Sequence, residues 1–161
     1  MANIGNGLPY VPSGFRLDGP IEEGDIVWYG QTAAAITQGQ ACGTSGGYVQ
    51  ALGGAFGATF IGVALFAQDN TGGTIGGVSM AVIKPQPNKF FWAPVKSATA
   101  VTVAAVGTMV DLYSTTGIGV DITDTTLASW GFEIIDYDAS TLAVAANAAG
   151  FVKGRVLQQP Q

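Results

Sequence analysis

The stretch that decides the fold is Gly24-Asp25-Ile26-Val27-Trp28-Tyr29, because its pattern returns as Gly107-Thr108-Met109-Val110-Asp111-Leu112-Tyr113. Each copy opens on glycine and continues into β-branched and aromatic residues, which is typical of a strand. Two more apolar runs follow each copy in the same order. They begin at Gly62 and at residue 78 in the first copy, and at Gly131 and Phe151 in the second. The repeated order predicts two similar β halves.

We therefore expect an all-β fold, a compact β-barrel or β-sandwich built from two similar halves. The halves span about 21–97 and 98–157, after an extended N-terminal arm at 1–20 and before a short tail at 158–161. The length of 161 residues suits one domain. A small sheet alone cannot bury both faces, so we expect the halves to share a core. Residues 60–66 have no polar face, which predicts a central strand covered on both sides.

The arm combines chain-breaking glycines and prolines with large apolar side chains. A disordered tail usually carries few large apolar groups. We therefore expect the arm to lie on a surface, which is its own barrel, a neighbouring subunit or a scaffold. The candidate contact residues are Leu8, Tyr10, Val11, Phe15 and Leu17.

Charge is scarce in this chain. Charged residues make up 11% of the sequence, less than half of the usual share of about 25%. This favours a protein that buries surface against other subunits; the alternative is a soluble β protein with a Thr, Ser, Asn and Gln surface. The net charge is −5 and the six basic residues are scattered. This argues against direct binding of nucleic acid or of an anionic membrane.

The sequence offers little for catalysis. It has no histidine, which excludes Ser-His-Asp triads, a Cys–His nucleophile and most zinc sites. Its one cysteine, Cys42, excludes an internal disulfide. Asp136 and Asp138 are expected on one strand face, with Ile134, roughly 7 Å apart; they could hold Ca²⁺ or serve a glycosidase, or simply form a solvated strand end. The run Gly72-Gly73-Thr74-Ile75-Gly76-Gly77 lacks the lysine of a phosphate loop. We expect no enzyme activity, no metal and no cofactor.

Three further features bear on the class of protein. Trp28, Trp92 and Trp130 could form a sugar-stacking platform, although aromatic residues in strands are more often core. The N-terminus has no basic region followed by an apolar core, so no signal peptide is expected. Residues 51–67 are too short and too glycine-broken for a membrane span. We expect synthesis in a cytoplasm.

Three short runs resemble the capsid decoration (cement) proteins of tailed bacteriophages. They are Gly24-Asp25-Ile26-Val27, Ile61-Gly62-Val63-Ala64-Leu65 and the closing Gly154-Arg155-Val156-Leu157. The resemblance covers most of residues 21–157. Proteins of that family are small β domains, commonly trimeric, that sit where capsomers meet.

The resemblance implies a virion structural protein that binds the major capsid protein on the outer shell between capsomers and stabilises it. It implies a homotrimer, made in the host cytoplasm and located on the capsid surface, with no catalytic residues. The five apolar arm residues would then contact the capsid or a sister subunit. The alternatives are another phage structural part, such as a head fibre base or tail protein, or a carbohydrate-binding β module.

Overall fold

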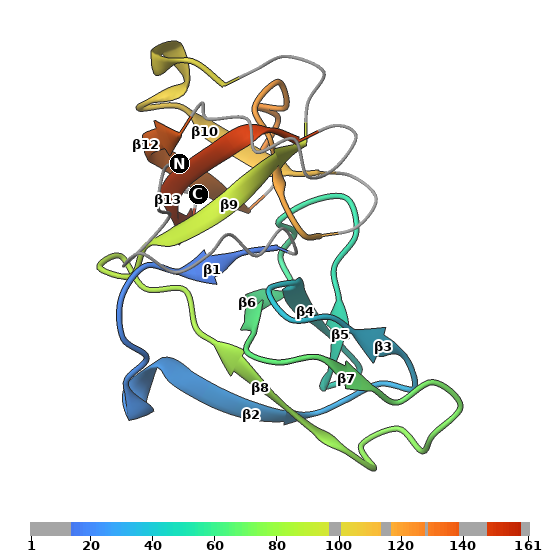
Figure 1. Ribbon diagram of the computed structural model, residues 1–161. Helices are drawn as coiled ribbons and strands as arrows, with labels where there is room; N and C mark the ends of the chain where they lie inside the picture. Colours follow the sequence, from blue (N-terminus) through green and yellow to red (C-terminus); the bar gives the residue numbers. More distant parts are fainter. Residues whose placement is uncertain (1–13, 97–100, 114–116, 128, 139–147, 159–161) are drawn as a thin grey trace.

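The structure is a computed structural model, which describes residues 14–96, 101–113, 117–127, 129–138 and 148–158. These residues form an all-β fold with a five-stranded barrel and additional sheets, which confirms the predicted fold class (Figure 1). The helical segments among them are two single 3-10 turns, η1 (Glu23–Asp25) and η2 (Val103–Ala105). No helix in these ranges is long and apolar enough to cross a membrane.

The first half of the chain forms an antiparallel sheet in the order β2-β8-β6-β4-β5. Its strands are β2 (Ile26–Gly30), β4 (Ala41–Ser45), β5 (Tyr48–Ala51), β6 (Phe60–Ala64) and β8 (Ser79–Ile83). β4 and β5 form a hairpin whose turn residues Gly46 and Gly47 have φ of 57° and 87°, as a two-residue turn of this hand requires. A short ribbon of β3 (Ala35–Ile36) and β7 (Gln68–Asp69) lies beside the sheet.

The barrel has the strand order β9-β11-β10-β12-β13 and is closed by the pairing of β13 with β9. Its strands are β9 (Phe91–Lys96), β10 (Met109–Leu112), β11 (Val120–Asp121), β12 (Trp130–Asp138) and β13 (Ala148–Gln158). The two-residue strand β1 (Arg16–Leu17) pairs with the start of β9, at Phe91 and Trp92. In Figure 1 the barrel lies above the first sheet.

The first sheet and the barrel each contain five strands, but they do not coincide with the two expected halves. Sheet membership changes between β8 and β9, so β9 belongs to the barrel although it precedes the expected boundary at 97/98. The repeated runs also pair in a different order. β2 pairs with β8, the third run of its copy, whereas β10 pairs with β12, the second run of its copy.

One large apolar core joins the two sheets. Val63 and Ile83 from the first sheet pack in the same cluster as Phe132 and Val152 of the barrel. The neighbouring residues Ala64 and Val82 face a second, smaller cluster within the first sheet. Both faces of β6 are therefore covered, and β6 lies between β8 and β4, which confirms the central strand expected at residues 60–66.

Candidate interaction surface

The five arm residues expected to make contacts fall into two groups. Leu8, Tyr10 and Val11 lie outside the described residues. Leu17 pairs with Phe91 through β1 and packs against the main core, and Phe15 belongs to that core. Phe15 and Leu17 therefore pack on this chain's own core, the first of the three surfaces considered for the arm.

Phe15 joins the two halves of the molecule. Its side chain is 4% exposed, and its ring centroid lies 6.0 Å from that of Phe56 and 5.7 Å from that of Phe132. Its backbone N–H donates to the Gly39 carbonyl at 2.8 Å. Residues 14–17 are therefore part of the folded body rather than of a separable arm.

The loop that carries Phe56 is held by a buried carboxylate. Asp111 of β10 is 2% exposed, and its Oδ1 accepts the backbone N–H groups of Phe56 at 2.6 Å and Leu112 at 2.7 Å. Burial raises the pKa of Asp111, and these hydrogen bonds oppose the rise. In the sequence, Asp111 stands between two apolar strand residues, Val110 and Leu112. This pattern could have indicated a buried carboxylate, but sequence reasoning missed it.

A second buried carboxylate anchors the start of β2. Asp25, with a side chain 3% exposed, pairs with Lys89 at 2.8 Å. Its carboxylate also accepts the backbone N–H of Glu22 at 2.8 Å and the Gln86 amide at 3.1 Å. The hydrogen bond from Lys89 is the main cause that lowers the pKa of Asp25, and the same bond raises the pKa of Lys89. The cluster ties β2 to the segment that leads into the barrel.

We expect Asp25 to make the fold less stable in acid. A carboxyl whose folded pKa lies below its unfolded value, 3.8 for Asp25, stabilises the fold above that value and loses this contribution as pH falls through the folded pKa. Denaturant unfolding of wild type and Asp25→Asn at pH 7 and pH 2 measures the effect. The stability difference should be clear at pH 7 and much smaller at pH 2.

The control for this experiment is Asp111→Asn, because the pKa of Asp111 is raised rather than lowered and therefore changes stability with pH in the opposite direction. As pH rises above the pKa of this carboxyl in the unfolded chain, ionisation of Asp111 lowers the stability of the fold. The Asp111 variant should therefore gain stability relative to wild type between pH 2 and pH 7. A stability difference for Asp25→Asn that is equal at both pH values would contradict the role given to its charge.

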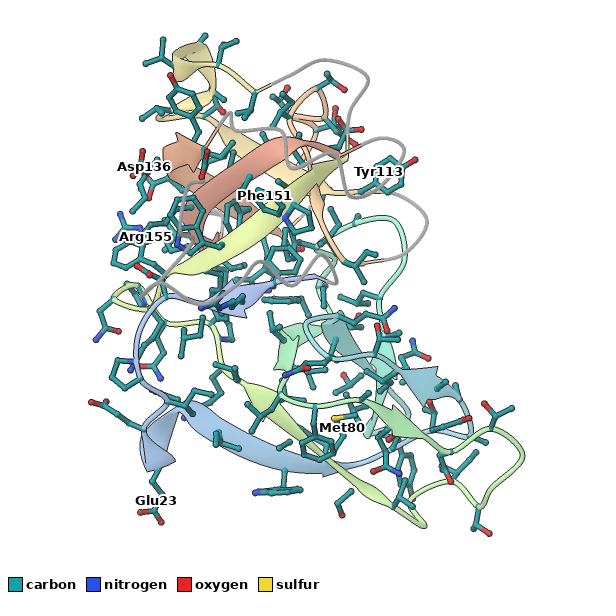
Figure 2. The ribbon with its side chains drawn as sticks, in the orientation of Figure 1. Glu23, Met80, Tyr113, Asp136, Phe151 and Arg155 are labelled. Carbon is teal, nitrogen blue, oxygen red and sulfur yellow. The ribbon has the colours of Figure 1, made fainter. Side chains whose placement is uncertain are left out.

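Basic residues on the outside of the barrel are used within the chain. Arg155 pairs with Glu133 at 2.6 Å, and Lys153 pairs with Asp18. The ring of Phe90 lies 5.8 Å from Lys153 Nζ and 5.9 Å from Arg155 Cζ, within the range of a cation–π contact. Figure 2 shows Arg155 at the side of the barrel. Its guanidinium also donates to the Pro87 carbonyl at 2.9 Å, which helps to fix the segment that precedes β9.

Of the carboxylates considered for a metal or a glycosidase, Asp136 and Asp138 share one strand face as expected, since they pair with Lys153 and Phe151 of β13, but this is not the face of Ile134. A bulge at Ile135 shifts the register of β12, so that Ile134 pairs with Gly154 while Asp136 pairs with Lys153. Because Ile134 is buried in the barrel core and adjacent residues of β13 face opposite sides, Asp136 lies on the outer face. The expected shared face of Ile134 and Asp136 is therefore wrong, and Asp136 is an exposed residue beside Lys153.

Cys42 and the glycine-rich run 72–77 both take part in the packing and hydrogen bonding of the fold. Cys42 is buried, and burial raises the pKa of its thiol to about 12. Residues 71–77 form an exposed loop, braced by the Asn70 amide, which donates to the carbonyls of Thr32 and Thr74 at 3.1 Å each. Gly73 fits closely against Asn70, since a Cβ there would lie 2.1 Å from Asn70 Oδ1.

The three tryptophans do not form one platform. Trp130 packs edge-on against Phe60, at 5.6 Å between ring centroids, and borders the main core. Trp92 Nε1 is buried, without a hydrogen-bond partner in the described part of the chain. Trp28 of β2, by contrast, is 61% exposed. Trp28 is therefore the one tryptophan of the three whose ring is largely open to solvent.

Trp28 belongs to a strip of apolar side chains at the surface of the first sheet. Its ring centroid lies 6.0 Å from that of Phe66. Two residues along β2, Gly30 leaves room for the ring of Tyr48, because a Cβ on Gly30 would lie 3.2 Å from Tyr48 Cδ1. Side chains at 28 and 30 project from the same face of a strand, so Tyr48 continues the strip. We call Phe66, Trp28 and Tyr48 the Trp28 strip.

The Trp28 strip carries no charge and extends towards a loop. A Cβ on Gly76 would lie 2.8 Å from Tyr48 Cε1, so this loop glycine packs against the same ring. Ile75, its neighbour in the chain, is 56% exposed. Exposed apolar groups that gather in this way mark interaction sites more often than single exposed residues do. Sequence reasoning singled out Trp28 but missed Tyr48 and Phe66. For Tyr48 the signal was the pair Gly30 and Gly76, which leave room for its ring.

No protein-family model matches this chain, and no curated protein matches it. The resemblance to decoration proteins therefore rests on the three short runs quoted above. In the structure these runs lie at the start of β2, along β6 and in β13.

Proposed function

We propose that this protein is a structural protein of a tailed-bacteriophage virion, a cement protein that binds the major capsid protein on the outer shell and stabilises the shell. The observation that carries the proposal is the Trp28 strip, an uncharged apolar surface on a compact β body. Burial of such surface contributes about 25 cal/mol per Å². A chain with 11% charged residues is suited to close packing against other subunits.

The arm supports the same proposal in a narrower form. Phe15 and Leu17 fix the end of the arm to the body, so Leu8, Tyr10 and Val11 are the arm residues that we propose as shell contacts. A shell contact made from both the arm and the Trp28 strip would bury a larger area than either alone. Contact area matters because association must overcome the loss of translational and rotational freedom.

The test is co-sedimentation of the purified protein with expanded, undecorated capsids of the phage that carries it. We expect saturable binding that Ile75→Lys and removal of residues 1–13 each weaken by about tenfold or more, the effect of losing a contact worth about 1.4 kcal/mol. The deletion keeps Phe15. Val103→Lys is the matched control, because Val103 is 69% exposed and lies on η2, in the barrel half. Failure of the wild-type protein to bind these capsids would overturn the proposal.

A carbohydrate-binding module is the second candidate, and the exposed Trp28 ring beside Phe66 favours it. Aromatic rings open to solvent can stack on the apolar face of a sugar. Titration of the protein with soluble glycans, followed by tryptophan fluorescence, tests this. A saturable change that is lost in Trp28→Ala would support sugar binding, and an unchanged spectrum would count against it.

A further inference from the structure

The N-terminal arm joins the folded body at a fixed point, close to the Trp28 strip. A Cβ on Gly14 would lie 2.5 Å from the Gly39 carbonyl oxygen, and Gly14 has a φ of 107°, so a glycine is required where the arm begins. The Gly39 N–H donates to the Ala64 carbonyl at 2.9 Å, and Phe66 of the strip follows two residues later. Hydrogen-bonded segments lie about 5 Å apart and two extended residues span about 7 Å, which places Phe66 within roughly 17 Å of Gly14.

The arm sequence favours an extended segment of matching length. Leu8-Pro9-Tyr10-Val11-Pro12 holds two prolines, which fix their own φ near about −65° and bias the residue before each towards the extended region. A polyproline II segment rises about 3.1 Å per residue, so that Tyr10 reaches about 12 Å from Gly14 and Leu8 about 19 Å. The distance to Phe66 falls between these two values. The apolar part of the arm therefore has the reach to lie on the strip.

The chemistry of the two surfaces matches as well. Proline-containing extended segments dock on exposed aromatic rings, because their shape is largely preformed and little entropy is lost. Trp28 is 61% exposed and Tyr48 is 38% exposed, and the ring centroids of Trp28 and Phe66 lie 6.0 Å apart. Residues 1–15 contain no charged side chain, which suits contact with an uncharged strip. The arm is therefore a segment of this chain that is well suited to cover the strip.

We propose that the arm segment Leu8-Pro9-Tyr10 lies across Phe66 and Trp28 of the same chain. The alternative occupant is the arm of a second copy. The short distance from the start of the arm favours the chain's own arm, because a tethered segment has a high effective concentration at the strip. The contact deepens the proposed function, and only its role at the shell rests on that function. Arm and strip together would offer a shell one preformed surface, which lowers the entropy lost on binding.

The experiment is NMR spectroscopy of the full chain with a spin label on Asn6→Cys, two residues before the segment. Cys42 is buried, with the pKa of its thiol raised to about 12, so the label reacts at residue 6. We expect the oxidised label to remove the Trp28 indole N–H signal. The Val103 amide signal should remain, because Val103 lies on η2 in the barrel half. Reduction of the label should restore the Trp28 signal.

Substitutions within the segment test which residues hold the arm. Leu8→Ser combined with Tyr10→Ser should release it, so that the Trp28 signal persists beside the oxidised label. Ile4→Ser is the matched control, since it is also an apolar-to-serine change in the arm but lies outside the segment, and the Trp28 signal should still be lost. All these changes lie before residue 14, so the core contacts of Phe15 are kept in each variant.

Three results would overturn this contact. One is a Trp28 signal that persists beside the oxidised label, and another is loss of the Trp92 or Trp130 indole signal in its place. The third is loss of the Trp28 signal when spin-labelled chains without isotope are mixed with isotope-labelled wild type, which would assign the strip to the arm of a second copy. Capsid binding is measured separately. A chain that binds capsids while its Trp28 signal persists would keep the proposed function and lose this inference, and the reverse result would keep the inference alone.

Discussion

Replacing Phe15 with alanine is expected to lower the free energy of unfolding by about 3 to 5 kcal/mol, the range found when a buried phenylalanine is truncated. The ring is 4% exposed and touches Phe56 of the first half and Phe132 of the barrel. Its loss leaves a cavity where the two sheets share their core. Since domains of this size are stable by only about 5 to 15 kcal/mol, the variant should unfold at a much lower denaturant concentration.

Denaturant unfolding followed by tryptophan fluorescence measures this effect. Val103→Ala is the control, because Val103 is 69% exposed and surface substitutions usually change stability by no more than about 0.5 kcal/mol. Removal of residues 1–20 should destabilise the protein at least as much as Phe15→Ala, because it removes Phe15 and β1 together. A Phe15 variant as stable as the control would show that residues 14–17 are a separable arm after all.

Local pattern was enough to predict the fold class and the central strand of the first sheet, although it gave no strand at β4. The apolar run at 60–66 predicted a central strand, and β6 is covered on both faces. The pair Gly46-Gly47 sits at a hairpin turn with both φ positive. These features depend on side-chain chemistry within a few residues, which a sequence displays directly.

Features that depend on distant partners were not predictable in this way. The residues of β9 do not indicate that this strand pairs with β13, about 60 residues later, rather than with the strands of the first sheet. The bulge at Ile135 is a single inserted residue, yet it moves Asp136 to the opposite face of the sheet. Phe15 looked like part of an arm because glycines and prolines surround its segment in the sequence, and its partners Phe56 and Phe132 lie far along the chain.

The candidate surface was predictable in part. Trp28 stands out in the sequence, but its exposure depends on β2 being an edge strand, which is a property of the sheet order. Tyr48 joins Trp28 because Gly30 and Gly76 lack a side chain where its ring lies. The sequence shows both glycines but not that they meet.

Gly62→Ala is expected to destabilise the fold by at least about 3 kcal/mol, since two separate costs act at this position. Gly62 has a φ of 148°, which side-chain-bearing residues rarely adopt. A Cβ built on Gly62 would lie 2.1 Å from the Ile83 carbonyl oxygen and 2.7 Å from Val82 Cγ1. The carbonyl belongs to β8, the neighbouring strand, so relief of the clash requires movement between two central strands. Denaturant unfolding measures the loss.

Gly57→Ala separates this explanation from a general cost of losing glycine. Gly57 has no atom within 4 Å of a built Cβ and no positive φ, so alanine there should be neutral or slightly stabilising through the unfolded state. If both variants lost similar stability, close packing of β6 on β8 would not be the reason for the glycine. If Gly62→Ala alone is unstable, the glycine in the run Ile61-Gly62-Val63-Ala64 is a requirement of strand packing. Its appearance in a resemblance to decoration proteins would then reflect a shared fold constraint rather than a shell contact.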